Sequence, residues 1–390
     1  MRVLQLGKFY DPVVGGMETA LKEICENMDE QVELRVIVAN TRYRTEHDHR
    51  NVPVTRVASL GKLFSCSLAP TFPLWSRRFE ADLIHVHMPN PLAEVSALLV
   101  ASKTPIVAHF HSDIVRQRHL LRLYEPLLKA FYRRANRIVV PTPRHIAVSQ
   151  FLREYRDKCR IVPYGVPVAR FNLTEAVHNK VDKLRDGPPA ILFVGRLVSY
   201  KGVEFLIRAM REVVAQLWIV GTGPLESSLR DLSQKEGLSE KVTFFGQVST
   251  TDVVAFYHAC TVFALPSITN AEMFGLVQLE AMACRKPVIS TSLPTGVSWI
   301  NEHGKTGYVV PPSDSVQLAE SINYLLNNPE LRFEMGEAGR RKVERDFTSA
   351  KMAASMLQVY REVVQEPQWG SAPAKRPRPA DVLPNLSKSA

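Results

Sequence analysis

Residues 190–220 read AILFVGRLVSYKGVEFLIRAMREVVAQLWIV and contain two apolar runs separated by an amphipathic stretch. The runs 190–194 and 217–220 have the length of buried strands, and the apolar residues of 203–214 recur at helical spacing. A strand, a helix and a second strand in this order predict a parallel βαβ unit. This stretch therefore indicates a parallel sheet that is covered by helices.

The same alternation of short apolar runs and amphipathic stretches continues in both directions along the chain. Further strands are predicted at 3–6, 34–38, 83–86, 106–110, 138–140, 160–162, 242–245, 262–265, 288–290 and 307–310. Helices are predicted at 17–28, 92–102, 115–134, 144–151, 226–236, 251–259, 276–284, 316–327, 331–345 and 350–364. Pro126 is expected to split the helix of 115–134 into two.

A polar segment from Tyr164 to Pro189 contains no predicted helix and separates the two halves of this pattern. The chain has 390 residues, which at roughly 100 to 200 residues per domain suits two domains. We predict a Rossmann-like domain at 1–166 and a second one at 167–346. A helix at 347–366 is expected to return to the first domain, and the proline-rich tail at 367–390 is expected to be disordered.

The amino-acid composition excludes several classes of protein. It is 45% hydrophobic, 23% charged and 8% aromatic, which excludes a disordered, collagen-like or coiled-coil chain. The net charge of +10 favours a polyanionic partner, such as nucleic acid, an acidic membrane face or a phosphorylated substrate. Five widely spaced cysteines, a first apolar stretch too short for a signal peptide and the lack of a spanning segment favour a cytoplasmic protein.

The candidate site lies where predicted strands end, because parallel sheets bind ligands at the carboxyl ends of their strands. Gly15 and Gly16 open the first helix, where free amides favour an anion or form a plain helix-entry turn. Arg196 and Lys201 follow the strand of 190–194. Such cations are often merely solvated, but a guanidinium and an ammonium at this junction suit a diphosphate. Gly221, after the next strand, permits close backbone approach.

The stretch 270–284, NAEMFGLVQLEAMAC, is the most specific signal. Glu272 precedes a predicted helix and Glu280 lies about a turn and a half inside it, so both carboxylates can border one pocket. The free amides at Phe274, Gly275 and Leu276 would form a floor that holds an anion. An acid-rich helix start explains Glu272 but does not explain Glu280 on an otherwise apolar face.

Together these motifs resemble the retaining glycosyltransferases of family 4. The similarity rests on two carboxylates spaced as E-x7-E around Phe274-Gly275-Leu276, with Gly195-Arg196-Leu197 and Lys201-Gly202 upstream, and it covers roughly residues 1–364. It implies an α/β chain with the GT-B fold, in which two Rossmann-like, doubly wound parallel-sheet domains face a central cleft.

The resemblance also implies a role for each matching residue. Arg196 and Lys201 would bind the diphosphate of a nucleotide sugar, Glu272 would hold the transferred sugar, and Glu280 the ribose. His111 would lie near the reacting carbon. The remaining donor contacts would come from Gly16, Gly221, Gly246, Val248, Phe274, Gly275 and Leu276. Met273 and Arg285 depart from the residues usual in the family, which leaves the neighbouring sugar contacts open.

Two His-x-His pairs, His85 with His87 and His109 with His111, each point to one side of a predicted strand and have spacing compatible with a metal site. Imidazoles that line the cleft are the simpler interpretation. The chain has no Asp-x-Asp of the kind that metal-dependent glycosyltransferases use, so we expect no metal and no cofactor beside the donor substrate. His47-Asp48-His49 is expected to lie in an exposed loop.

Residues 115–137 carry seven cations and one acid, which is +6 of the whole +10. Leucines and aromatic residues interleave with these cations, as in a basic helix that lies on an anionic bilayer. With the apolar and basic stretch 63–78, they predict peripheral docking at the inner face of the cell membrane. The alternative is a sheet-covering helix with a solvated basic face.

We therefore predict a retaining, metal-independent hexosyltransferase. It would move a hexose to a lipid-linked acceptor, such as a polyprenyl diphosphate, or to a saccharide in cell-surface polysaccharide synthesis. The stretch 111–117, HSDIVRQ, resembles O-antigen and exopolysaccharide mannosyltransferases and favours GDP-mannose over UDP-sugars. A GT-B phosphorylase, a sugar-nucleotide epimerase, a catalytically silent partner and a basic nucleic-acid-binding protein are the alternatives. No nucleic-acid recognition motif supports the last of these.

Overall fold

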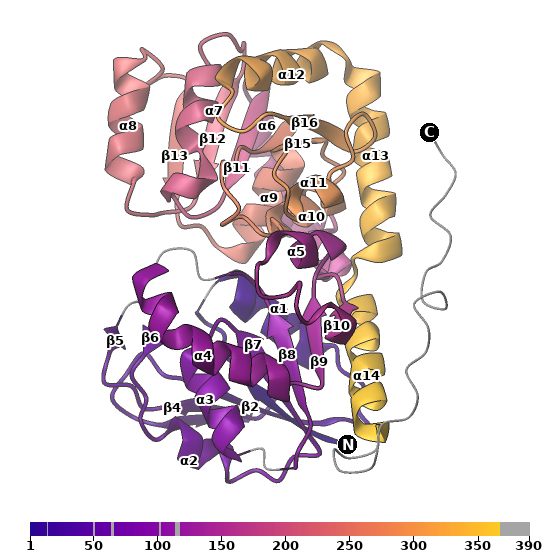
Figure 1. Cartoon of the computed structure of the whole chain (residues 1–390). Coiled ribbons are helices and arrows are strands. Elements are labelled where there is room, and N and C mark those ends of the chain that lie inside the picture. The colour runs from indigo at the N-terminus through magenta and orange to yellow at the C-terminus, as the bar shows by residue number, and fades with distance from the viewer. Residues whose placement is uncertain (14, 50, 64–65, 101–102, 114–117, 367–390) are drawn as a thin grey trace.

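The chain folds into two lobes, one above the other, as a computed structural model shows (Figure 1). The structure describes residues 1–366 except 14, 50, 64–65, 101–102 and 114–117, with backbone alone at 62–63 and 118–123. The predicted tail at 367–390 lies outside the described residues. Each lobe is built on one large sheet, and its central strands are buried because helices cover both faces of the sheet.

The first lobe contains an eight-stranded sheet with the order β10-β9-β8-β7-β1-β2-β4-β3. Its strands are β1 (Arg2–Leu6), β2 (Glu33–Ala39), β3 (Glu46–Asp48), β4 (Val54–Val57), β7 (Leu83–Met88), β8 (Ile106–Phe110), β9 (Arg137–Val140) and β10 (Cys159–Ile161). Its helices are α1 (Gly16–Glu26), α2 (Phe72–Ser76), α3 (Pro91–Val100), α4 (Arg118–Arg134) and α5 (Pro143–Val148), and a small hairpin joins β5 (Lys62–Leu63) to β6 (Cys66–Ser67).

The second lobe contains a six-stranded, fully parallel sheet with the order β13-β12-β11-β14-β15-β16. Its strands are β11 (Ala190–Val194), β12 (Gln216–Val220), β13 (Val242–Gly246), β14 (Val262–Leu265), β15 (Val288–Thr291) and β16 (Gly307–Val310). Its helices are α6 (Glu175–Arg185), α7 (Val203–Ala209), α8 (Glu226–Lys235), α9 (Thr250–Ala259), α10 (Leu276–Ala283), α11 (Val297–Ile300), α12 (Ser315–Asn327) and α13 (Pro329–Asp346).

Three local predictions were wrong. The segment expected to lack helix contains α6, whose N-cap Thr174 accepts a hydrogen bond from the amide of Val177 and whose apolar face packs on α9. Pro126 does not split α4, which continues through it. Part of the predicted loop around His47 forms the edge strand β3, which pairs antiparallel with β4.

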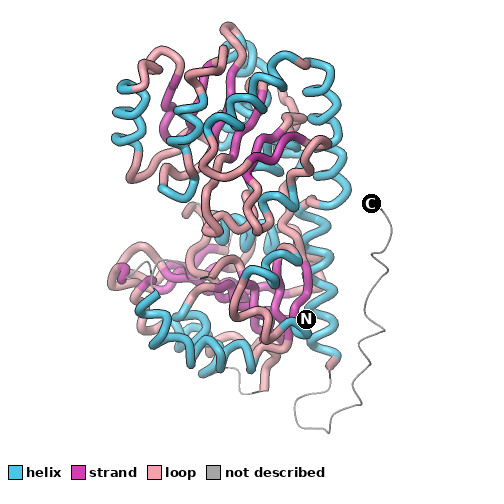
Figure 2. The backbone as a smooth tube through the Cα atoms, turned by 45° about the horizontal axis from the view of Figure 1, so that its top comes forward, coloured by secondary structure: helices cyan, strands magenta, loops and turns pink. Residues whose placement is uncertain are grey.

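The chain crosses between the lobes twice, and the two crossings lie against each other. The amide of Val166 donates to the carbonyl of Phe347 at 2.8 Å, and the amide of Ser349 donates to the carbonyl of Val166 at 3.1 Å. A Cβ on Gly165 would stand 2.2 Å from the carbonyl oxygen of Thr348, so only glycine permits this approach. After the second crossing, α14 (Ser349–Gln365) runs down the side of the first lobe, in line with α13 (Figures 1 and 2).

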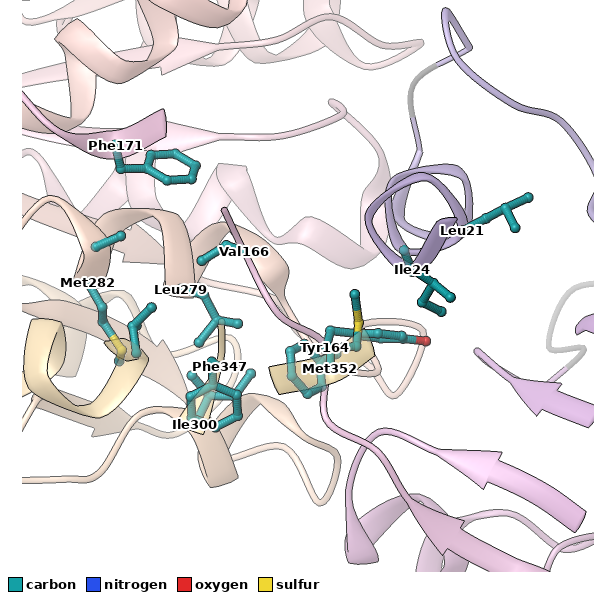
Figure 3. Close-up of a cluster of buried hydrophobic side chains, with 14 of the residues drawn as sticks. Leu21, Ile24, Tyr164, Val166, Phe171, Leu279, Met282, Ile300, Phe347 and Met352 are labelled. Carbon is teal, nitrogen blue, oxygen red and sulfur yellow. The ribbon is translucent and has the colours of Figure 1, made fainter. Parts of the chain in front are cut away.

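A single hydrophobic cluster joins the lobes at these crossings. Tyr164, Val166, Phe347 and Met352 lie between α1 of the first lobe and α10 of the second (Figure 3). All four side chains are buried. This packing holds the two interlobe crossings, which form the hinge between the lobes, in place. A ligand site would then lie at the edges of the two sheets that face each other.

Candidate active site

Three glycines lie side by side where adjacent strands of the second sheet end. Gly195 follows β11, Gly221 follows β12, and Gly246 ends β13. Gly221 has φ +127°, and a Cβ on it would stand 2.1 Å from the carbonyl oxygen of Gly195. Its amide donates to the carbonyl of Gly246 at 2.8 Å. The glycines thus give the backbone of this edge a close-packed, side-chain-free surface, and half-buried Val248 follows it.

Arg196 and Lys201 occupy this edge in different states. Arg196 is exposed, and within the described part of the chain its guanidinium has no ion pair or hydrogen bond. Lys201 lies on a single turn of 3₁₀ helix at Ser199–Lys201, is 8% exposed, and makes an ion pair with Glu272. Lys201 is therefore fixed within the site, and Arg196 is available to an incoming anion.

Glu272 is fixed by several partners. Besides Lys201, its carboxylate accepts a hydrogen bond from the buried hydroxyl of Ser267 at 3.0 Å, and its carbonyl accepts one from Thr295 at 2.7 Å. Ser267 was not among the predicted site residues. Its position two residues after β14, at the carboxyl end of a parallel strand, is the signal that would have identified it.

The N-terminus of α10 follows Glu272 directly. Gly275, its N-cap, has φ +77°, and a Cβ there would meet Leu265 at 2.7 Å, so the tight entry requires glycine. The amides of the first helical turn have no partner within the helix, and the helix dipole adds partial positive charge. The segment of Phe274, Gly275 and Leu276 therefore presents a positive helix tip close to Glu272.

Glu280 lies in the second turn of α10 and has a separate partner. The hydroxyl of Tyr257 on α9 donates to its carboxylate at 2.6 Å. Burial raises the pKa of Glu280, and the hydrogen bond from Tyr257 opposes that rise. The two carboxylates of the E-x7-E motif thus differ, since Glu272 is ion-paired and Glu280 is bonded to a neutral phenol. Tyr257 was not predicted as a site residue, because no motif in the sequence marks it.

His111 approaches the site from the first lobe. It follows β8, is 8% exposed, and has hydrogen-bond partners at both ring nitrogens, Tyr164 at 2.5 Å and His87 at 2.9 Å. The ring of Tyr164 also lies edge-on against Phe274, with 4.8 Å between ring centroids. His111 is therefore joined to the tip of α10 through one residue. Gly16, in contrast, is exposed at the start of α1 with open space around it.

The prediction that the His-x-His pairs line a cleft was wrong for three of the four rings. His85, His87 and His109 are fully buried, and ring nitrogens of these three lie within 4.8 Å of one another, as a metal site requires. Both nitrogens of His87, however, already have protein partners, Gln5 and His111. Burial lowers the pKa of all four histidines, that of His87 to about 3, so the cluster is neutral at pH 7. The expectation of a metal-free enzyme stays a prediction.

Two residues outside the usual family pattern have clear structural roles. Met273 is buried within the hydrophobic cluster of the first lobe, so the loop before α10 packs directly on that lobe. Arg285 has φ +57° and makes an ion pair with Glu337 on α13 at 2.6 Å. Neither side chain joins the charged groups of the site.

Part of the basic stretch 115–137 is buried and does not lie at the surface of the protein. Leu128, Phe131 and Tyr132 are buried in the core of the first lobe, and Arg137 makes ion pairs with Glu362 and Glu366 of α14. These residues cannot contact a membrane, which corrects that part of the prediction. Residues 114–117 and the side chains of 118–123, which carry much of the predicted basic face, lie outside the description. No helix in the described ranges is long and apolar enough to cross a membrane.

Two Rossmann-like lobes with a glycine-lined strand edge and a positive helix tip are an arrangement that suits a phosphorylated ligand, as the resemblance to GT-B glycosyltransferases implies. Comparison with known proteins agrees. Residues 14–170 match the family model "Glycosyltransferase Family 4", and residues 175–342 match "Glycosyl transferases group 1".

Relatives that match nearly the whole chain identify the family. The D-rhamnosyltransferase WbpZ of Pseudomonas aeruginosa is 33% identical over 360 residues, covering 90% of this chain and 93% of that protein. The O-antigen chain mannosyltransferase C of Escherichia coli is 32% identical over 379 residues, covering 94% and 99%. The chain therefore belongs to glycosyltransferase family 4 and resembles bacterial O-antigen enzymes.

Solved structures show the same fold. Sucrose-phosphate synthase from Thermosynechococcus elongatus has a TM-score of 0.79 at 23% identity, covering 93% of this chain and 98% of that chain. Anabaena HepE in complex with UDP-glucose has a TM-score of 0.75 at 20% identity, covering 93% and 100%. The predicted GT-B architecture is confirmed.

Proposed function

We propose that this chain is a retaining hexosyltransferase that transfers mannose from GDP-mannose to a lipid-linked or saccharide acceptor in cell-surface polysaccharide synthesis. The observation that carries the proposal is the exposed guanidinium of Arg196 beside the glycine edge, which has no partner among the residues that the structure describes. A protein keeps an exposed, unpaired cation at a strand end at little cost, and a diphosphate is the ligand that such a cation and the tip of α10 fit.

The geometry supports a mechanism in which protein charges stabilise the leaving group. As the bond between the anomeric carbon and the diphosphate oxygen breaks, negative charge grows on the phosphate. Lys201, held by its ion pair with Glu272, and the amides of α10 lie at preorganised positions for this charge, and the exposed guanidinium of Arg196 would add to them. The acceptor oxygen forms the new bond on the same face of the sugar, and its proton passes to the leaving phosphate. No protein nucleophile is needed.

Glu272 is assigned to sugar orientation under this proposal. Its carboxylate already has Lys201 and Ser267 as partners, which lowers its tendency to attack carbon and fixes its direction. Glu280, bonded to Tyr257 inside α10, would contact the nucleotide ribose. Gly16, Gly221, Gly246 and Val248 would contribute backbone contacts to phosphate and base, and His111 would lie near the reacting carbon.

The identity of the donor sugar is the most specific part of the proposal. Mannosyltransferases occur repeatedly among the relatives, including the phosphatidyl-myo-inositol mannosyltransferase of Mycobacterium leprae at 30% identity over 329 residues. The Pseudomonas aeruginosa relative is instead named a D-rhamnosyltransferase, so an activated D-rhamnose is the second candidate. Anabaena HepE was solved with UDP-glucose, which keeps UDP-sugars as the third.

A thermal-shift screen of GDP-mannose, UDP-glucose and free GDP, followed by a transfer assay with a polyprenyl-diphosphate-linked saccharide, tests the proposal. A donor at 100 times its Kd should stabilise the fold by about 2.7 kcal/mol, which is a shift of several degrees in Tm. The product should keep the anomeric configuration of the donor, and EDTA should leave the rate unchanged. Turnover of GDP-mannose that needs inorganic phosphate, or proceeds without an acceptor, would instead indicate a phosphorylase or an epimerase.

The acceptor is proposed to be reached at an anionic membrane surface through the first lobe. Four leucines there are exposed, each at least 44%, near α2, α3 and α4: Leu60, Leu68, Leu74 and Leu99. Arg77 and Arg78, at the end of α2, are exposed beside them, and Arg78 stacks on Trp75 at 4.1 Å. Exposed apolar groups next to cations suit insertion into an anionic interface.

Flotation with liposomes that contain phosphatidylglycerol tests this surface. The wild-type chain should float with the vesicles and lose binding at high salt. Leu74→Glu should reduce flotation several-fold, while Val214→Glu, at an 86% exposed site of the second lobe, should leave it unchanged. Absence of flotation by the wild-type chain would reject membrane docking without affecting the donor site.

A further inference from the structure

A continuous chain of hydrogen bonds runs through the core of the first lobe to His111. Tyr360 on α14 accepts from the Gln5 amide at 2.8 Å, Gln5 bonds Nε2 of His87 at 3.1 Å, and Nδ1 of His87 bonds Nε2 of His111 at 2.9 Å. The hydroxyl of Tyr164 completes the chain at Nδ1 of His111. Its members come from α14, β1, β7, the end of β8 and the first interlobe crossing, and all are buried.

The donors and acceptors of this chain can be assigned in one direction. The amide group of Gln5 donates to Tyr360, so its carbonyl oxygen accepts from Nε2–H of His87. Neutral His87 then has only a lone pair at Nδ1, which must accept from Nε2–H of His111. His111 in turn has a lone pair at Nδ1, and the hydroxyl of Tyr164 donates to it. The amide of Gln5 therefore determines the tautomer of an imidazole two hydrogen bonds away.

Both ring nitrogens of His111 are thus occupied by protein groups. An imidazole in this state is held in place and is not free to exchange a proton with a substrate unless one partner leaves. The partner nearest the second lobe is Tyr164, whose ring packs against Phe274 at the tip of α10. Tyr164 also precedes Gly165, at the close contact of the two crossings. One side chain therefore contacts the first-lobe histidine, the helix tip and the hinge.

We propose that Gln5, His87, Tyr360 and Tyr164 are positioning residues that hold His111 as its Nε2–H tautomer at the transfer site. Tyr164 couples this arrangement to the approach of the α10 tip. The inference rests on the proposed function in one respect, namely that His111 faces the sugar donor. It assigns no substrate contact to the four positioning residues themselves.

A metal site in the same cluster is the competing explanation, and it fits the hydrogen bonds less well. Ring nitrogens without a partner among the described residues belong to His85 and His109 only, within this cluster. His87 would have to release Gln5 or His111 to become a third ligand, and zinc sites take at least three protein ligands. A buried water that bonds His85 and His109 satisfies the same atoms without breaking the chain.

Steady-state kinetics on the full chain tests the proposal. Tyr164→Phe keeps the ring contacts with Phe274 and removes only the hydroxyl that bonds His111. We expect kcat to fall about 10- to 100-fold, because a small displacement of the His111 ring changes the geometry in which the sugar is held, with the donor KM within about twofold. Tyr360→Phe should lower kcat in the same way. Tyr155→Phe is the matched control, because the hydroxyl of this buried tyrosine of the first lobe donates to the carbonyl of Lys129 and does not belong to the hydrogen-bond chain of His111.

Histidine ¹⁵N spectra give a second readout that does not depend on turnover. At pH 7, His87 and His111 should both be neutral with the proton on Nε2, and Tyr164→Phe should shift the His111 nitrogens while His145 stays unchanged. A charged or Nδ1–H His111, or wild-type kcat in Tyr164→Phe, would overturn the proposal. A wild-type chain that turns over no nucleotide sugar would instead reject the proposed function, and the spectra would still decide whether the hydrogen-bond chain exists.

Discussion

The two sheets present opposite kinds of polar group at the edges that face each other. At the end of the second sheet, Arg196 is exposed and unpaired among the described residues, and the helix tip of α10 offers free amides. In the first sheet, Gln5 of β1 and three histidines of β7 and β8 are completely buried, and Gln5 and His87 bond each other while His85 bonds Tyr360 of α14. One edge keeps charge available, and the other keeps neutral groups in fixed places.

Desolvation explains this difference. A buried ion costs several kcal/mol unless it is paired, so charges for an anionic ligand must lie where water or the ligand can reach them. Neutral imidazoles can be buried at lower cost if hydrogen bonds satisfy them. The second lobe is thus suited to binding charge, and the first lobe is suited to placing a group against it. Each experiment below acts on one side of this contrast.

Among the substitutions, Lys201→Ala should have the largest effect, because Lys201 is both a buried ion-pair partner and a cation of the proposed donor site. The ion pair with Glu272 is buried, so removing the cation leaves an unpaired carboxylate and should lower the free energy of unfolding by about 3 to 5 kcal/mol. Transfer activity should also be lost. Urea denaturation and kcat/KM measure the two effects. The double variant Lys201→Met/Glu272→Leu should regain most of the stability and none of the activity, and recovery of activity would contradict the assignment.

Arg196→Ala should affect activity alone. The guanidinium has no partner within the described residues, so the Tm should change by about 1 °C or less. Loss of a preorganised cation should lower kcat/KM by about 10² to 10³, or roughly 3 to 4 kcal/mol of transition-state stabilisation. Arg230→Ala, at an exposed arginine of the same lobe, is the control and should retain full activity. Equal losses of kcat/KM in both variants would show that Arg196 has no specific role in the transfer reaction.

Lowering the pH should destabilise the folded chain, because the first lobe contains several buried histidines. The pKa values of His85, His87, His109, His111 and His145 are lowered by burial, so below about pH 6.5 the unfolded chain binds more protons than the folded one. Each histidine then removes up to about 1.4 kcal/mol of stability per pH unit until the pH reaches its own lowered pKa, which is about 3 for His87 and about 4 for His145. Urea midpoints between pH 7 and pH 5 measure this loss.

Buried acids act in the opposite sense and are fewer. Burial raises the pKa of Glu94 to about 7 and raises those of Asp113 and Glu280, so these groups gain protons on folding and add stability as the pH falls. A His85→Asn variant should show a shallower net slope, by about 1.4 kcal/mol per pH unit. An unchanged slope would mean that His85 is not neutral and buried in the folded chain.

Tyr257→Phe should have the smallest effect of the four. It removes the hydroxyl that bonds Glu280 and leaves the ring in place, so nucleotide affinity should fall by about 1 kcal/mol or somewhat more, which is roughly five- to tenfold in Kd. Burial raises the pKa of Glu280, and without this hydrogen bond that pKa should rise further. Calorimetric titration with nucleotide measures the change. Unaltered affinity would place Glu280 outside the ribose contact.

The fold was largely predictable from local patterns. Buried parallel strands such as β8 and β11 read as short apolar runs with helical stretches between them, and this pattern required two doubly wound lobes. The errors occurred where tertiary packing overrides local signals. α6 has a polar sequence and depends on its contact with α9, while α4 continues through Pro126 because its neighbours support it.

The candidate site was predictable where strand ends and helix starts determine position. Arg196, Lys201, Glu272 and Gly275 all follow the carboxyl ends of strands in the second sheet, and a parallel sheet brings such positions to one edge. Ser267 could have been predicted from its position just after β14, but Tyr257 and Tyr164 were not predictable as site residues. Their functions depend on side-chain directions and on contacts between elements far apart in the sequence.

The amino-acid sequence by itself determined two parallel-sheet lobes and the charged residues at the end of the second sheet, because periodicity and position after a strand are local properties. Only the tertiary structure decided the state of each group. Whether Arg196 is free, Lys201 is paired or His111 is held at both nitrogens depends on burial and on partners up to hundreds of residues away. Desolvation and hydrogen-bond geometry act between neighbours in space, and the order of residues along the chain does not record them.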